Sequence, residues 1–344
     1  MQKIIFQGID DLEVKDDEKI LDPENPEIYC LGICLNSGCM YDCIYCYAKG
    51  NMPYRNEEQL RYEEYKKIIA DAAKIGCKTV IITGASSPSE PLLAKKLKDI
   101  ISIISFYNMY TVIYTNAYVL GKEELCQKIH GCTSMQLVEF FYKNNVSLMI
   151  SCDSIDEKDY NDIVQCENAF EIFKQAISNL IKGGFYGQKS GDDEYIVTRV
   201  AISSVINKKN INYLDKMKNF VYSNNWQFIC KFPSLTGNAV KYRDYFFTPD
   251  EVKKLRFSTS DKYTDKKETL VIESLRGYKF CLANQLGIAI NGKGQPLTCL
   301  SGSIFLEQDI TTRNYDLAEL VIKKKKAFGL KPGDCPKKKK YYKE

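Results

Sequence analysis

The chain has 344 residues, of which 44% are hydrophobic and 27% charged, with fourteen cysteines, one histidine and a formal net charge of +4. This length suffices for one large or two modest domains with a packed core, but the apolar runs are too short to cross a bilayer. The first eighteen residues carry six acids and lack the apolar core of a secretory signal, so we expect a cytoplasmic protein. Its cysteines are then thiols, metal ligands or catalytic groups rather than disulfides, and one histidine excludes most zinc hydrolases and histidine-based triads.

Strand-like and helical segments alternate between residues 28 and 237. Apolar runs predict strands over 28–35, 79–84, 110–116, 146–154, 195–206 and 227–232. Helical periodicity predicts helices over 57–75, 92–106, 122–144, 168–181 and 211–223. Near-continuous apolar strands that alternate with helices indicate a parallel sheet covered on its outer face, so we predict the α/β class and a partial (β/α)6 TIM-like barrel. In such a barrel reactive side chains gather where the strands end.

Beyond residue 237 the pattern changes. Residues 248–251 (TPDE) offer a hydroxyl, a proline and a glutamate in the order of a capping box, which predicts a new helix. A polar stretch over 258–268 separates it from a compositionally distinct C-terminal section. We therefore divide the chain into an N-terminal extension (1–27), a barrel (28–237), a bridge (238–276) and a small α+β domain with a basic tail (277–344).

The strongest chemical signal is CMYDCIYC over residues 39–46, which places Cys39, Cys43 and Cys46 in one loop after the first predicted strand. Three thiolates so close in sequence can bind three irons of a cubane cluster and leave the fourth iron without a protein ligand. Zinc sites more often use two C-x2-C pairs or a nearby histidine, and the motif has neither. We therefore predict a 4Fe–4S cluster with one open coordination position.

This loop resembles the motif of the radical S-adenosylmethionine (SAM) enzymes, which have three cysteines at this spacing and an aromatic residue, here Tyr45, just before the last. The resemblance implies that SAM chelates the open iron and that the reduced cluster cleaves SAM to methionine and a 5′-deoxyadenosyl radical, which abstracts a hydrogen atom from substrate. It also implies an electron donor such as flavodoxin or ferredoxin. A barrel suits this chemistry because it keeps a radical away from water.

Further SAM contacts are implied at the ends of the predicted strands. Glu90-Pro91 matches the end of a Gly-Gly-Glu-Pro segment that holds the SAM amino group in similar enzymes, and Arg199 could pair with the methionine carboxylate bidentately. For each residue taken alone, a helix cap or a satisfied core group is an equal alternative. The expected SAM-binding residues are Tyr45, Gly84, Glu90, Thr115, Asn116, Ser151, Asp153 and Arg199.

A second cysteine motif lies beyond the barrel. Twelve residues separate Cys281 from Gly294, and four more separate Gly294 from Cys299. Residues 286–290 between them predict a strand that leads into an Asn-Gly hairpin turn at 291–292. The two thiols would then lie on either side of one hairpin, able to converge on a metal.

This segment is similar to the twitch and SPASM domains, which carry auxiliary 4Fe–4S clusters in a subset of radical SAM enzymes. A full SPASM domain has a dense set of further cysteines, whereas only Cys335 follows here, so the resemblance implies one auxiliary cluster of the twitch type. Its expected ligands are Cys281, Cys299 and Cys335. The fourth ligand stays open between Cys230 or another barrel cysteine, a non-cysteine group and the substrate.

The other eight cysteines are expected to pack mostly as small hydrophobic side chains. Cys152 and Cys230 are exceptions near strand ends, where a thiol could return a hydrogen atom to a substrate radical. His130 is expected at the surface. From Lys323 onward ten lysines face only two acids, which gives a net charge of +8. This is either a solvated tail or a contact for an anionic partner such as RNA or an acidic peptide.

The sequence therefore predicts a radical SAM enzyme that modifies a ribosomally made peptide, a maturase. The alternatives are a dehydrogenase, epimerase or lyase acting on a small molecule such as a sugar or nucleoside, an RNA-modifying enzyme, and a non-enzymatic iron–sulfur scaffold. Only 27 residues precede the first predicted strand, too few for the leader-peptide-binding domain of many maturases. That domain can be a separate protein, which we count as an expected partner.

Overall fold

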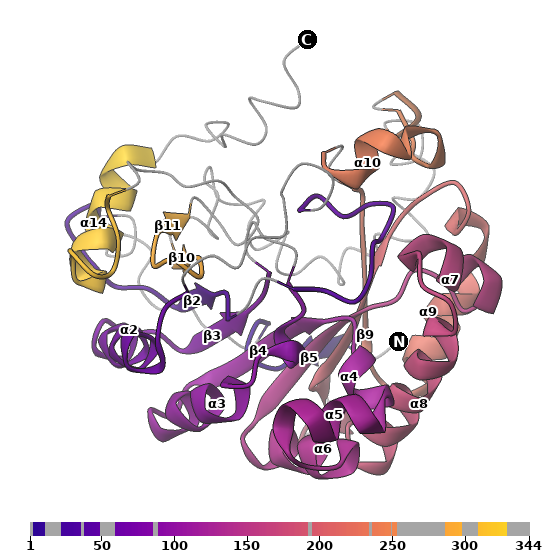
Figure 1. Cartoon of the computed structure of the whole chain (residues 1–344), viewed down its shortest axis with the longest axis horizontal. Coiled ribbons are helices and arrows are strands. Elements are labelled where there is room, and N and C mark those ends of the chain that lie inside the picture. Colours follow the sequence, from indigo (N-terminus) through magenta and orange to yellow (C-terminus); the bar gives the residue numbers. More distant parts are fainter. Residues whose placement is uncertain are drawn as a thin grey trace. The chain divides into compact units, whose positions relative to one another are not determined.

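The computed structural model describes residues 3–10, 22–35, 38–48, 59–84, 89–191, 195–233, 236–248, 250–252, 286–297 and 309–328. The chain divides into two compact units, whose helices and strands are labelled in Figure 1. Unit 1 comprises residues 1–10, 39–53 and 114–270, and unit 2 comprises 11–38, 54–113 and 271–344. Among the described residues, no helix combines the length and the hydropathy needed to span a membrane.

Unit 2 is organised around parallel strands. β2 (Cys30–Ile33) pairs with β3 (Thr79–Ile82), which pairs with β4 (Tyr110–Thr115), a strand whose last two residues belong to unit 1. Helix α2 (Tyr62–Lys74) leads from β2 to β3, and α3 (Leu97–Phe106) leads from β3 to β4. Each helix buries residues three or four apart, which lie on one face. These are Tyr65, Ile68, Ile69 and Ala72 in α2, and Leu97, Ile100, Ile101 and Ile104 in α3.

A C-terminal hairpin continues the sheet of unit 2. β10 (Gly287–Ile290) pairs in parallel with β2 and antiparallel with β11 (Pro296–Leu297). The Gly294 amide donates to the Asn291 carbonyl oxygen, and the Asn291 amide donates to that of Gln295, both at 3.0 Å, which confirms the predicted hairpin. The segment expected in a separate C-terminal domain thus shares its sheet with β2.

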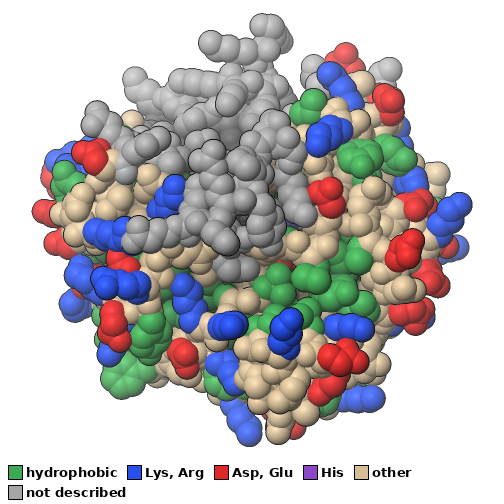
Figure 2. All heavy atoms as spheres, viewed as in Figure 1, with side chains coloured by type: hydrophobic (Ala, Val, Ile, Leu, Met, Phe, Trp, Pro, Cys, Tyr) green, Lys and Arg blue, Asp and Glu red, His purple; other side chains and the backbone are tan. Residues whose placement is uncertain are grey.

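Helix α14 (Leu317–Phe328) carries the first lysines of the basic tail. Lys324 is only 1% exposed, and its Nζ donates to the Gly287 carbonyl oxygen at 2.5 Å. Lys325 donates to the Asn25 carbonyl oxygen at 2.7 Å. The interpretation as a solvated or anion-binding tail is therefore wrong for these two lysines, and the tail beyond residue 328 lies outside the described residues. On the face in Figure 2, basic and acidic side chains are interspersed over the described part.

The main strands of unit 1 are also parallel. β8 (Val200–Val205) lies between β5 (Val146–Ser151) and β9 (Gln227–Lys231). Helices connect these strands, and several bury large side chains; Tyr160, on α7, is 1% exposed. The described helices of this unit are α4 (Tyr118–Gly121), α5 (Glu123–His130), α6 (Ser134–Lys143), α7 (Glu157–Val164), α8 (Ala169–Lys182), α9 (Leu214–Ser223) and α10 (Asn238–Lys241).

A second, small sheet in unit 1 divides the predicted strand over 195–206 into two. β7 (Tyr195–Thr198) pairs in parallel with β1 (Lys3–Phe6) and antiparallel with β6 (Gln188–Lys189). The chain then changes sheet at Arg199 and continues as β8. The prediction of one strand is wrong here because its halves find different partners, which an apolar run alone does not reveal.

Helix boundaries in unit 1 follow local signals. The predicted helix over 122–144 is divided at Gly131, which has φ of 64°, and Thr133 then caps α6 with its hydroxyl. His130 ends α5 and is only 6% exposed, so the prediction that it lies at the surface is wrong. The capping box is confirmed: the Glu251 amide donates to the Thr248 hydroxyl at 3.2 Å, and the Thr248 amide donates to the Glu251 carboxylate at 2.6 Å.

The predicted fold class is confirmed. Helical structure follows each of six strands in chain order: β2, β3, β4, β5, β8 and β9. Every adjoining pair of these strands that is described within a unit is parallel. The carboxyl ends of such strands are where a (β/α) fold positions its reactive groups.

Candidate active site

The loop of the CMYDCIYC motif belongs to unit 1 and is fixed through its backbone. The Cys46 amide donates to the Cys43 carbonyl oxygen at 3.0 Å, which closes a turn between the two cysteines. The amides of Asp42 and Ile44 donate to the carbonyl oxygens of residues 164 and 163 at 3.1 and 3.0 Å. The loop is therefore attached to the C-terminal end of α7, the helix that follows β5.

Asn238, the first residue of α10, holds the same loop from the other side. Its amide donates to the Cys46 carbonyl oxygen at 3.0 Å. Its side-chain Nδ2 donates to the Asp42 carboxylate at 2.8 Å and to the Cys43 carbonyl oxygen at 3.1 Å. At 3% exposure, Asn238 makes these bonds out of contact with water. Sequence reasoning missed this residue, although the Gly-Asn pair just after the sixth strand was a turn signal.

Cys39 and Cys46 lie within electrostatic reach of Cys43 in this loop. Burial raises the pKa of the Cys43 thiol well above its ordinary value, and negative charge on Cys39 and Cys46 raises it further. Three neighbouring thiolates repel one another, so they coexist only around a cation. A soft thiolate set of three, without a histidine among the described neighbours, fits an iron–sulfur cluster.

Asn116 directly follows β4 and faces this loop. Its Nδ2 lies 3.6 Å from the Cys39 sulfur, and its Oδ1 accepts a hydrogen bond from the Tyr118 amide at 3.0 Å. The neighbouring Thr115 hydroxyl accepts from the Ala117 amide at 2.9 Å. Together these bonds stabilise a turn in which Ala117 has φ of 59°.

Asp153, two residues beyond β5, forms a second polar group beside the cysteines. Its Oδ1 accepts from the Val205 amide at 2.5 Å, and its carbonyl oxygen accepts from Asn210 Nδ2 at 3.0 Å. Burial raises the pKa of this carboxyl group to about 6, against a lowering by Tyr45 and by the Val205 amide. Asp153 also raises the pKa values of Cys43 and Tyr45, so its carboxylate lies within electrostatic reach of the motif.

Lys231, the last residue of β9, is a cation that sequence reasoning did not single out. It is opposite Val205 in the register of β8 and β9, and Val205 is the residue whose amide binds Asp153. Desolvation lowers the pKa of Lys231, and Asp153 opposes that shift. Within the described residues, no hydrogen bond or ion pair of this side chain is found. A lysine at the end of an apolar strand was the available signal.

Two further sequence-predicted residues lie at opposite ends of their strands. Ser151 ends β5 and is opposite Ser203 in the register, close in sequence to Asp153. Arg199 precedes β8, at the amino end. Its guanidinium donates to the Tyr142 carbonyl oxygen at 2.9 Å and stacks on the rings of Tyr142 and Phe185. The structure does not bring Arg199 together with the cysteines.

Gly84 and Glu90 belong to unit 2. Gly84 lies just beyond β3. Glu90 is 2% exposed, its amide donates to the Gly38 carbonyl oxygen at 2.6 Å, and its carboxylate accepts from the Leu92 amide at 3.1 Å. The carboxylate therefore caps the short 3-10 helix Pro91–Leu93.

The remaining cysteines fall into two groups. Cys281, Cys299 and Cys335 lie outside the described residues. Of the eight others, Cys34, Cys77, Cys126 and Cys152 are buried, as expected for packing, and burial raises the pKa of Cys126 to about 12. Cys230, on β9, is half-buried, and burial raises its pKa to about 12 as well.

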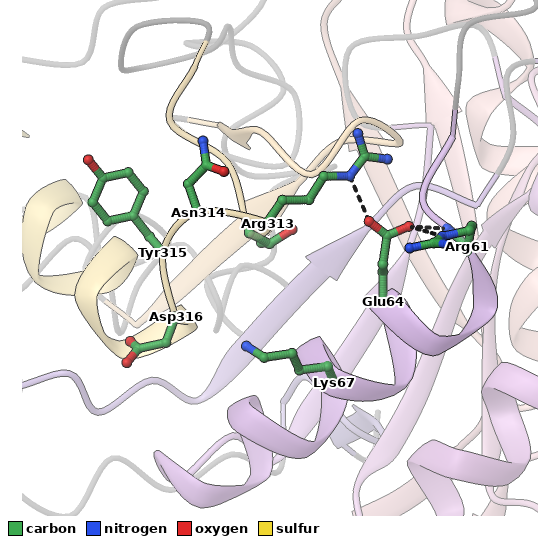
Figure 3. A pocket seen from close by; sticks show the side chains of 8 residues that line it. Arg61, Glu64, Lys67, Arg313, Asn314, Tyr315 and Asp316 are labelled. Carbon is green, nitrogen blue, oxygen red and sulfur yellow. Dashed lines mark hydrogen bonds and ion pairs between the residues drawn. The ribbon is translucent and has the colours of Figure 1, made fainter.

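An open pocket of about 830 Å³ in unit 2 is lined by polar and charged side chains (Figure 3). Glu64 lines it, with one carboxylate oxygen 2.6 Å from Arg313 Nε and the other 3.3 Å from Arg61 Nε. The hydrogen bond from Arg313 is the main cause that lowers the pKa of Glu64 to about 2. The ion pair between Arg313 and Glu64 ties the segment before α14 to α2. The lining residues are Arg61, Glu64, Lys67, Thr312, Arg313, Asn314, Tyr315 and Asp316.

Comparison with known sequences agrees with this picture. The Radical SAM superfamily description matches residues 33–191. The GTP 3′,8-cyclase of Clostridium botulinum is 23% identical over 314 residues, which cover 86% of this chain and 87% of that protein. The GTP 3′,8-cyclase of Mannheimia succiniciproducens is 26% identical over 209 residues, 59% of this chain, and the match spans only 52% of that protein.

Solved structures share the fold. Streptococcus suis SuiB bound to its precursor peptide SuiA has a TM-score of 0.62 and 17% identity, and the match covers 88% of this chain and 66% of SuiB. anSMEcpe with bound AdoMet has a TM-score of 0.58 and 14% identity, with 91% of this chain and 82% of that one covered. The cysteine spacing, the parallel α/β fold and the family match agree, and residues 33–191 of the chain match the radical SAM superfamily.

Proposed function

We propose that Cys39, Cys43 and Cys46 hold a 4Fe–4S cluster whose open iron binds SAM, and that the enzyme modifies a ribosomally made peptide. When held by these cysteines and reduced, the cluster would supply the electron that cleaves SAM to methionine and the 5′-deoxyadenosyl radical. The observation that carries the proposal is a loop of three cysteines, in which Cys39 and Cys46 lie within electrostatic reach of Cys43, fixed by α7 and Asn238 at the ends of parallel strands.

The polar residues around the loop have proposed SAM-binding roles. Tyr45, Ser151 and Asp153 follow or border the strand ends of unit 1 and remain the proposed contacts there. Thr115 and Asn116 are not retained as SAM contacts, because their side-chain oxygens accept hydrogen bonds from the amides of the turn after β4. From unit 2 we retain Gly84 and Glu90. Arg199 is not retained, because its guanidinium contacts the rings of Tyr142 and Phe185 at the amino end of β8.

An auxiliary 4Fe–4S cluster held by Cys281, Cys299 and Cys335 is part of the proposal. It is supported by the hairpin of β10 and β11, which the apolar run over 286–290 and the Asn-Gly turn predicted. A flavodoxin or ferredoxin is the proposed electron donor, and a separate leader-peptide-binding protein is a proposed partner.

The charges at the strand ends favour a peptide over a nucleotide. The GTP 3′,8-cyclase relatives suggest a nucleoside triphosphate, a group that proteins bind with several arginines and lysines. Among the described strand-end loops of unit 1 the cations are Lys208, Lys209 and Lys231. Lys208 pairs with Glu251 at 3.8 Å and Lys209 with Asp162 at 3.0 Å. Of these three described cations, only Lys231 has no ion pair among the described residues, and a single cation suits one carboxylate better than a triphosphate.

The test is SAM cleavage by the anaerobically reconstituted full chain with dithionite as reductant. We expect 5′-deoxyadenosine in wild type and none in the variant Cys39→Ala/Cys43→Ala/Cys46→Ala. No 5′-deoxyadenosine in wild type would overturn the proposed chemistry. Addition of a synthetic peptide encoded by a short reading frame beside the gene should raise the yield and change the mass of that peptide. If GTP raises the yield and the peptide does not, the nucleotide alternative replaces the peptide.

A further inference from the structure

The orientation of the Asn116 side chain is fixed by its surroundings. A backbone N–H can only donate, so the Asn116 atom 3.0 Å from the Tyr118 amide must be the carbonyl oxygen. The side-chain NH2 group then faces the Cys39 sulfur, 3.6 Å away. Asn116 is 8% exposed, so its contact with sulfur is largely shielded from water.

We infer that Asn116 is a positioning residue that acts through Cys39, donating an N–H···S hydrogen bond that raises the reduction potential of the SAM-binding cluster. This inference rests on the proposed function, because it requires the cluster on Cys39, Cys43 and Cys46. It assigns to Asn116 a different role from the SAM contact expected at this position.

The direction of the effect follows from charge. Reduction adds one electron from the donor to the cluster, 4Fe–4S 2+ to 1+, and neither makes nor breaks a bond. Part of the added negative charge resides on the cysteine sulfurs. A hydrogen-bond donor at sulfur therefore stabilises the reduced state more than the oxidised state, and hydrogen bonds to the sulfurs are among the established determinants of cluster potentials.

Local structure favours an electronic role over a purely structural one. The turn after β4 has two side-chain bonds of its own, from Thr115 to the Ala117 amide and from Asn116 to the Tyr118 amide. Both use an oxygen acceptor, which serine or aspartate also provides. Only an amide at position 116 offers that acceptor together with a donor toward Cys39.

The experiment is a dithionite titration of the anaerobic, reconstituted full chain. Each point is measured by the electron paramagnetic resonance signal of the reduced SAM-binding cluster. That signal is identified as the one that SAM alters and that the variant with all three motif cysteines replaced by alanine lacks. The variants are Asn116→Ala, Asn116→Ser and Asn116→Asp. Asn116→Ser and Asn116→Asp keep an acceptor for the Tyr118 amide. The matched control is Thr115→Ala, which weakens the same turn and leaves the contact with Cys39.

We expect Asn116→Ala and Asn116→Ser to shift the midpoint to a more negative potential. At the wild-type midpoint, the ratio of reduced to oxidised cluster should fall about fivefold, which corresponds to roughly 1 kcal/mol, a typical hydrogen bond. Asn116→Asp should shift it further, because it adds a negative charge. Thr115→Ala should keep the wild-type midpoint.

The inference is overturned if Asn116→Ala or Asn116→Ser assembles the cluster with the wild-type midpoint, or if Thr115→Ala shifts the midpoint equally. It is also overturned if the exchangeable-proton coupling to the cluster is unchanged in Asn116→Ala, a measurement that needs no potential. Failure of the proposed function has a different result, since wild type would then show no signal that SAM alters.

Discussion

The cysteine loop of unit 1 and helix α14 of unit 2 are both held by side chains that donate to backbone carbonyl oxygens, but the donors differ in charge. Asn238 binds the loop with a neutral amide. Lys324 and Lys325 bind β10 and residue 25 with ammonium groups. A charged donor makes a stronger hydrogen bond, yet a buried cation beside an iron–sulfur cluster would alter its potential. Amide donors around the motif fix its geometry without adding a net charge.

The largest expected effect is on the loop itself. Replacing Cys39, Cys43 and Cys46 together by alanine should abolish SAM cleavage and reduce the iron content from about eight to about four per chain, the remainder being the proposed auxiliary cluster. Iron analysis and chromatography of 5′-deoxyadenosine measure both. A wild-type iron content near four would contradict the auxiliary cluster.

The attachment of α14 through the charged Lys324 side chain is tested by Lys324→Met. This substitution keeps the approximate length of the side chain and removes its charge. Loss of a charge-assisted hydrogen bond should cost about 2 kcal/mol. Protection of the α14 amides from hydrogen exchange should then fall roughly thirtyfold. Lys326→Met, at an exposed lysine paired with Glu24 at 2.8 Å, is the control and should change protection by less than about threefold. Equal losses of amide protection in the two variants would contradict a larger contribution from the buried Lys324 than from the exposed Lys326.

The attachment of the cysteine loop through the neutral Asn238 side chain is tested by Asn238→Ala. It removes the bonds to the Asp42 carboxylate and the Cys43 carbonyl oxygen and should cost about 1.4 kcal/mol in local stability. The reconstituted cluster should then lose iron to a chelator roughly tenfold faster. The decay of its visible absorption measures this rate. The exposed neighbour Val240 provides a control, because Val240→Ala should leave the rate unchanged.

The smallest expected effect is at the ion pairs of Glu64. Its pKa is lowered from 4.5 to about 2 in the folded chain, so its stabilisation is complete above the unfolded pKa and disappears as the pH falls toward 2. Glu64→Gln should lower stability by about 0.5 kcal/mol at pH 7, and the difference from wild type should shrink below pH 4.5. Thermal unfolding across this pH range measures it. A difference independent of pH would indicate packing rather than charge.

Local sequence information predicted much of the fold and the centre of the site. Five of the six apolar strands, the hairpin at residues 291–295 and the capping box of Thr248 depend on neighbours in sequence, and the structure contains them. The remaining strand, over 195–206, is divided between two sheets. Asn238 could not be predicted in the same way, because it contacts a loop nearly two hundred residues earlier. Lys324 looked like one lysine among many, since only tertiary contact with β10 shows that it is buried.

The small sheet of unit 1 has a practical consequence for protein production. β7 has a neighbour on each side, β1 from the first residues of the chain and β6. Deleting residues 3–6 would leave one row of its backbone amides and carbonyl groups unpaired. An unpaired strand edge is a template for joining another molecule, so an N-terminal truncation intended to aid crystallisation would promote aggregation, whereas a purification tag placed ahead of Lys3 would leave that edge covered.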